Sequence, residues 1–165
     1  MRYLQLFESF NRLQVSLFSE MPRNYQIGVV IRAYEVNEDV EWSTTLGNID
    51  WINDTEVVNQ IISDYSNHYP NKRFAYGLVP TNILIDKVCA SEDSAIHDYD
   101  GGWYEYHQAY SSTNNAKHTS FEIPILVDDS DSEFIEDGWH RFHWYIKSGL
   151  KEIPIVSYDP DIKLF

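Results

Sequence analysis

Residues 137–141 combine the start of a helix with groups that can bind or activate an anion: Asp137, Gly138, Trp139, His140 and Arg141. The free N–H groups and the positive dipole end of a helix N-terminus attract anions. A glycine lets an anion approach the backbone, and the guanidinium of an arginine matches the oxygen geometry of a phosphate. This segment therefore predicts a phosphate site at the start of a helix.

The side chains of this segment suggest specific roles. Asp137 and His140 are predicted catalytic residues, because a carboxylate or an imidazole can orient a nucleophile or Mg²⁺. The predicted ligand-binding residues are Gly138, Trp139, Arg141 and His143. A structural alternative exists as well: Asp137 and Gly138 could form only a helix cap, and Arg141 could pair with the acidic residues before it.

The elements expected around this segment form a strand, strand, helix, strand unit. Residues 123–127 and 133–135 are predicted strands separated by a turn, and residues 153–156 are a further buried strand. Between them, a helix is expected to start at Asp137-Gly138 and to end at Gly149, in the left-handed conformation just past a helix end. The order predicts an α/β (α+β) fold, with a small mixed sheet and packed helices.

The rest of the chain predicts five further elements. Apolar residues at helical spacing in residues 1–20 indicate an amphipathic helix, and β-rich runs indicate strands at residues 26–34 and 36–42. Residues 53–69 begin with helix-capping chemistry and place apolar side chains on one side of about three turns, which predicts a core-facing helix. Residues 103–110 predict a short aromatic helix.

The pattern Asp-Gly-x-His-Arg at residues 137–141, with Gly-Leu at 149–150 and Ile-Pro-Ile-Val at 153–156, resembles the ParB/sulfiredoxin-like superfamily. It is closest to the members that carry Asp-Gly-x-His-Arg. Residues 78–85 look like the first strand of that family, and residues 123–127 look like the second. The resemblance implies a ParB/sulfiredoxin-like domain at residues 76–165 and an N-terminal extension at residues 1–75, packed on that core.

The family resemblance implies a nucleotide such as ATP, CTP or ADP on the helix start, often with Mg²⁺. The expected function is therefore binding of a nucleotide or other phosphorylated ligand, with phosphotransferase or phosphodiester hydrolase activity as the next expectation. Trp139 stands where sulfiredoxins have a reactive cysteine, so reduction of sulfinic acids is not expected. The second arginine and the basic DNA-binding helices of partition proteins are also missing.

Other polar residues are candidates for the site. In the related family the segment between the first two strands forms an active-site wall, which makes Glu105 a candidate catalytic residue and adds four further candidate site residues: Glu92, Asp98, Asp100 and His107. His140 and His143 could bind a metal with Glu136. Packing is favoured for two histidines on an aromatic helix, so the metal is left unknown.

The formal net charge of −14 over 165 residues opposes nonspecific attraction to nucleic acids and to anionic membranes. It leaves a second class of function open, an acidic protein that imitates the DNA phosphate backbone and inhibits a nucleic-acid-binding protein partner. A single cysteine, Cys89, excludes an internal disulfide. With no leader and no run of eighteen apolar residues, the expectation is a cytoplasmic protein that does not enter a membrane.

Overall fold

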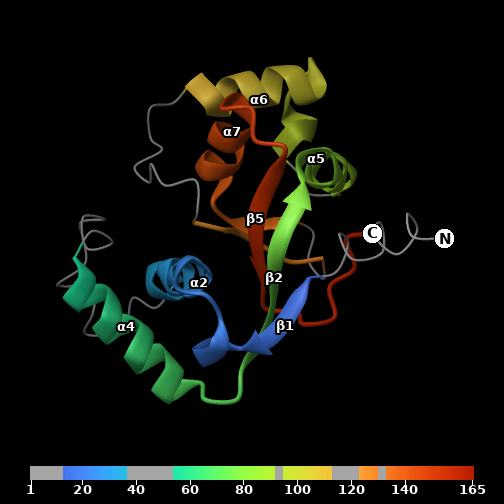
Figure 1. Ribbon diagram of the computed structural model, residues 1–165. Coiled ribbons are helices and arrows are strands. Elements are labelled where there is room, and N and C mark those ends of the chain that lie inside the picture. Colours follow the sequence, from blue (N-terminus) through green and yellow to red (C-terminus); the bar gives the residue numbers. More distant parts are fainter. Residues whose placement is uncertain (1–12, 37–53, 92–94, 113–122, 130–132) are drawn as a thin grey trace.

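The computed structural model describes residues 13–36, 54–91, 95–112, 123–129 and 133–165, and these residues form a mixed sheet with helices on both faces (Figure 1). The sheet order is β1-β2-β5-β3-β4. The strands are β1 (Gln14–Leu17), β2 (Arg73–Pro80), β3 (Ile125–Val127), β4 (Ile135–Asp137) and β5 (Glu152–Ser157). β3 and β5 are parallel, and the other neighbouring pairs are antiparallel. The predicted fold class, an α/β (α+β) protein with a small mixed sheet, is confirmed.

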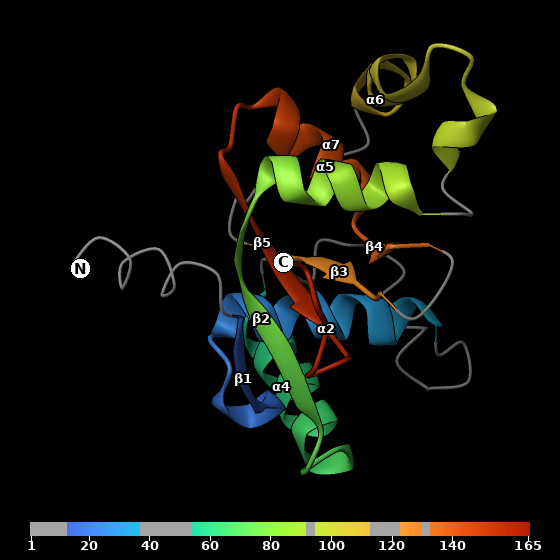
Figure 2. The same cartoon turned by 90° about the vertical axis from the view of Figure 1, so that its right-hand side faces the viewer.

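Two layers of helices enclose the sheet. The helices are α2 (Arg23–Val36), α4 (Thr55–His68), α5 (Thr81–Ala90), α6 (Gly102–Ser112) and α7 (Trp139–Lys147), with short 3₁₀ turns η1 (Phe18–Glu20) and η3 (Ala95–Asp98). Figure 2 shows α2 and α4 on one side of the strands and α5, α6 and α7 on the other. Within the described parts of the chain, no helix has the length and apolar composition needed to cross a bilayer.

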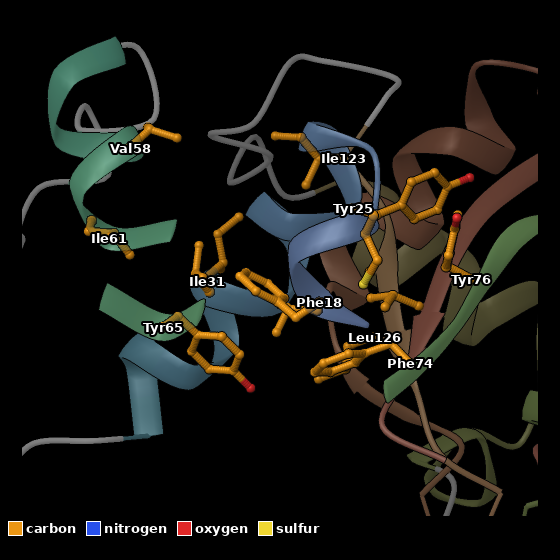
Figure 3. Packing of buried hydrophobic residues seen from close by; sticks show 14 residues of the cluster. Phe18, Tyr25, Ile31, Val58, Ile61, Tyr65, Phe74, Tyr76, Ile123 and Leu126 are labelled. Carbon is orange, nitrogen blue, oxygen red and sulfur yellow. The ribbon is translucent and has the colours of Figure 1, made fainter. Parts of the chain in front are cut away.

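The alternation of side chains along each strand creates two separate cores. Leu126 of β3 points into a first core under α2 and α4, whereas its neighbours Ile125 and Val127 point into a second core under α5, α6 and α7. Figure 3 shows the first core, in which the ring of Phe18 from η1 packs on Tyr65 of α4 and on Phe74 of β2. Its buried members are Phe18, Met21, Tyr25, Val29, Val30, Ile31, Val58, Ile61, Tyr65, Phe74, Tyr76, Ile123, Leu126 and Val156.

The segment before residue 76 shares both the sheet and the first core with the rest of the chain. β1 pairs with β2 from Gln14 opposite Tyr76 to Leu17 opposite Arg73. The boundary expected between residues 75 and 76 falls inside β2, whose other edge pairs with β5. The sheet that supports α7 therefore includes strands from the predicted N-terminal extension and from the predicted domain at residues 76–165.

The strand predicted at residues 26–34 is wrong, because these residues lie in helix α2. The β-branched residues Val29, Val30 and Ile31 are buried in the first core on this helix. Their burial between the sheet and α4 overrides their intrinsic preference for strands. Gly28 allows the close packing, since a Cβ at this position would overlap the ring of Pro124.

The predicted N-terminal helix and first family strand also need correction. Residues 1–12 of the predicted helix lie outside the described residues, while residues 14–17 form β1, because they pair along the edge of β2. Of the strand predicted at residues 78–85, only residues 78–80 lie in β2, and residues 81–85 lie in helix α5. Residues 37–42 of the other predicted strand lie outside the described residues, and Val36 ends α2.

The remaining elements were predicted well. The helices expected at residues 53–69 and 103–110 correspond to α4 and α6, and the strand expected at residues 153–156 corresponds to β5. β3 begins two residues later than expected, and β4 lies at residues 135–137 rather than 133–135. The strand, strand, helix, strand unit around α7 is therefore present.

Candidate functional site

Helix α7 begins directly after the edge strand β4, at a glycine with a left-handed backbone. Gly138 is the N-cap with φ of +94°, and Asp137 before it is the last residue of β4. The predicted acidic N-cap is thus replaced by a residue without a side chain. The other end agrees with the sequence, since Gly149 has φ of +79° just past the helix.

Gly138 is required for a second reason, the close approach of Arg141. A Cβ at Gly138 would lie 2.8 Å from Nη2 and 3.1 Å from Nε of Arg141, and 3.1 Å from Cγ2 of Ile125. The guanidinium therefore occupies the space that a side chain at position 138 would take. The glycine and the arginine form one packed unit at the start of α7.

Arg141 itself is buried, with 4% of the residue exposed. Its Nη2 donates to Oδ2 of Asp137 at 2.8 Å and to the carbonyl oxygen of Pro124 at 3.3 Å. The guanidinium thus links the first turn of α7 to β4 and to the residue before β3. Its Nε–H donor is buried and makes no hydrogen bond among the described residues.

Both acidic residues at the end of β4 face an arginine. Asp137 has a side chain that is 15% exposed and pairs with Arg141. Glu136 lies 3.6 Å from Nη2 of Arg32, which comes from α2. The pairing with Arg141 is the structural alternative that the sequence had left open, and it places Asp137 beside the helix start.

The first turn of α7 exposes one of its predicted site residues. His140 is exposed, and Trp139 is half-buried. The Trp139 ring lies 6.0 Å from the ring of Tyr106 on α6. Solvent therefore reaches His140, and Trp139 connects the helix start to α6.

His143 lies one turn further along α7 and is fully buried. Its Nδ1 is 2.8 Å from Nδ1 of His107 on α6. Burial, and then the nearby His107 and His140, lower the pKa of His143 from 6.5 to about 3. This side chain packs between helices and is remote from solvent, although the sequence predicted it to bind a ligand.

The candidates between the first two family strands are dispersed. Oε2 of Glu105 accepts a hydrogen bond at 2.8 Å from the backbone N–H of Gly101, at the start of α6. Asp98 and Asp100 are exposed, and Glu92 lies outside the described residues. Only His107 joins a predicted residue of α7. Nothing in the sequence pattern indicated this pairing, since histidine spacing within one helix says nothing about the facing helix.

The described residues include no group of three His, Cys, Asp or Glu side chains placed to hold a metal ion. Glu136 pairs with Arg32, and His143 pairs with His107. The suggested trio of Glu136, His140 and His143 thus gains no support, and a role for Mg²⁺ stays a prediction.

In comparisons with known proteins, no protein-family model, no curated protein and no solved structure matches this chain. The ParB/sulfiredoxin-like resemblance therefore stays a prediction that rests on the motif at residues 137–141 and the elements around it.

Proposed function

We propose that this protein binds a phosphorylated small ligand, foremost a nucleotide, at the N-terminus of α7. The observation that carries the proposal is the start of the nine-residue helix α7, where the N-cap Gly138 makes no side-chain hydrogen bond to the first turn. The dipole of such a helix favours an anion at this end. The resemblance to the ParB/sulfiredoxin-like superfamily points to the same place.

The contacts of Arg141 define its part in this proposal. Its Nη2 donates hydrogen bonds to Asp137 and Pro124. The guanidinium therefore positions the helix start and does not bind the ligand in a bidentate manner. Its Nε, which lacks a partner among the described residues, remains next to Gly138. Backbone amides and His140 would then make the outer contacts to the phosphate.

If the bound ligand is a nucleotide, the proposal extends to phosphotransferase or phosphodiester hydrolase activity. His140 is exposed at the helix start and would orient the attacking group, while Asp137 stands beside it as a ligand for Mg²⁺ or as a hydrogen-bond acceptor. The pairing with Arg141 keeps the Asp137 carboxylate oriented. A cytoplasmic location, which was an expectation from the sequence, belongs to the same proposal.

A second candidate is an acidic inhibitor of a nucleic-acid-binding protein. The observation that favours it is the net charge of −14, together with the engagement of Arg32 and Arg141 by acidic neighbours. In this case the α7 region would keep its architecture without binding a small ligand. A calorimetric titration with phosphates and nucleotides distinguishes the two candidate functions.

The test is calorimetric titration of the full chain with phosphate, pyrophosphate, ATP, CTP, GTP and ADP, with and without Mg²⁺. His140→Glu places a carboxylate at the helix start, where it suits the dipole and occupies the anion position. Ser63→Glu is the matched control, because Ser63 is exposed on α4 and the variant gains the same charge. We expect His140→Glu to weaken binding by at least about tenfold and Ser63→Glu to have little effect.

Two results would contradict the proposal. Equal weakening by both variants would show a response to net charge alone. The absence of binding to every phosphate and nucleotide, combined with displacement of DNA from a protein partner, would favour the inhibitor.

A further inference from the structure

A hydrogen bond between two imidazoles joins α6 to α7. Nδ1 of His107 and Nδ1 of His143 are 2.8 Å apart. A hydrogen bond between two nitrogens needs one proton, so one imidazole donates and the other must be neutral at Nδ1 to accept. If both imidazoles are protonated, two N–H groups face each other and the bond is lost.

Aromatic rings hold the two imidazoles in place. The ring of Trp103 stacks on His107, at 5.5 Å between centroids and 8° between planes, and it also stacks on His143 at 5.6 Å and 24°. Trp139 stacks on the histidine of its own helix at 6.3 Å, and Tyr106 meets His143 edge-on at 4.9 Å. The pair therefore sits within the α6–α7 contact, with His143 fully buried and His107 half-buried.

The electrostatic surroundings resist protonation of the pair. The charged groups that act on it are basic: Lys147 of α7 acts on His107, and His140 of α7 acts on His143. The ring of Tyr106 on α6 also lies against His143, and Tyr99, which follows η3, packs on Tyr106. Burial, then Lys147, lowers the pKa of His107, and the pKa of His143 is lowered to about 3.

We propose that the His107–His143 hydrogen bond is a proton-sensitive latch that holds α6 against α7 and releases it on acidification. This inference concerns the contact between the two helices and is independent of ligand binding at the start of α7. The latch would be closed near neutral pH, when one proton is shared by the pair. Acidification would loosen α6 before the sheet unfolds, because α6 lies on the outside of the second helix layer (Figure 2).

The sign and size of the effect follow from linkage. A histidine whose folded pKa is below its unfolded pKa stabilises the fold fully above about 6.5, and this stability is lost as the pH falls. For His143, a folded pKa of about 3 and an unfolded pKa of 6.5 predict a change with pH in the equilibrium constant for packing of α6 against α7. This constant should fall about 30-fold between about pH 7.5 and about pH 5. The lowered pKa of His107 acts in the same direction.

The experiment is NMR spectroscopy of the full chain at both pH values. Hydrogen-exchange protection factors report opening of α6, and imidazole ¹⁵N shifts report the protonation of each histidine. His107→Asn is the informative variant, because an amide can donate to neutral His143 or accept from protonated His143. His97→Asn is the control, since His97 is exposed.

We expect acidification to lower the protection of α6 amides by about 30-fold more than that of β5 amides in the wild type and in His97→Asn. In His107→Asn the difference should become smaller, because the amide oxygen can accept from protonated His143, and the pKa of His143 should rise. If His107→Asn does not fold, the pH dependence of α6 protection and of the imidazole shifts in the wild type still tests the proposal. Two imidazoles that titrate independently near 6.5, or α6 protection that is insensitive to pH, would overturn the proposal.

Discussion

Gly138 combines two requirements at one residue, a left-handed backbone and space for a guanidinium. The first requirement can be inferred from a glycine at a helix start. The second cannot, because it depends on Arg141 folding back beside the glycine and bonding to Asp137. The motif Asp-Gly-x-His-Arg is thus compatible with a ligand-binding role and with a structural role. Three of its five residues, Asp137, Gly138 and Arg141, form the structural contacts at the start of α7.

Replacement of Gly138 by alanine should be costly for both reasons. We expect Gly138→Ala to lower the free energy of unfolding by about 2–5 kcal/mol, the sum of left-handed strain and a crowded Cβ. Gly149→Ala is the matched control: φ is +79° and nothing lies within 4 Å of the added Cβ. It should cost only about 1–2 kcal/mol. Urea denaturation measures both, and equal losses would show that Arg141 does not constrain position 138.

Helix α4 depends on a side-chain cap that the sequence indicated. Oδ1 of Asp54 accepts from the backbone N–H groups of Glu56 at 3.0 Å and Val57 at 3.2 Å. We expect Asp54→Ala to lower the free energy of unfolding by about 1 kcal/mol, whereas Asp54→Asn keeps an acceptor oxygen and should lose less. Thermal and urea denaturation compare the two variants. An alanine variant as stable as the asparagine variant would exclude the capping role.

Elements were predictable from the sequence where local signals and packing agree. In α4, the capping residue Asp54 and the spacing of Val58, Ile61 and Tyr65 point to the same helix. In α2 the local signals and the packing disagree. Its β-branched residues favour a strand, but they are buried as a helix against residues from distant parts of the chain. β1 was missed for a similar reason, since an edge strand is defined by its pairing with β2, about sixty residues later.

The candidate site was predictable only at the level of the chain segment. The position of a helix start at residues 137–138 follows from local chemistry, and the structure contains it. The burial of Arg141 and the pairing of His143 with His107 depend on Pro124 and on α6, which come from other parts of the chain. Long-range contacts of this kind leave no periodicity in the sequence.

At the scale of the whole molecule, one sheet separates two cores that each contain buried tyrosines. Tyr25 lies in the first core and Tyr145 in the second. Burial raises the pKa of both to about 12, with a further contribution from Tyr76 at Tyr25 and an opposing one from Arg141 at Tyr145. Burial is also the main cause that raises the pKa of Tyr65 and Tyr158. Both cores therefore resist ionisation of their phenols.

These shifts predict cooperative alkaline unfolding. A tyrosine with a raised folded pKa stabilises the protein fully below about pH 10, and the stability is lost as pH rises toward 12, by up to about 1.4 kcal/mol per pH unit for each fully buried phenol. Because β3 and β5 supply side chains to both cores, we expect tyrosinate absorbance and far-UV circular dichroism to change together. Tyr145→Phe should lessen the pH dependence by about one proton, while costing about 1 kcal/mol at neutral pH through the lost hydrogen bond to the carbonyl of Ile123. Two separate absorbance steps would instead mean that the cores on the two faces of the sheet unfold independently.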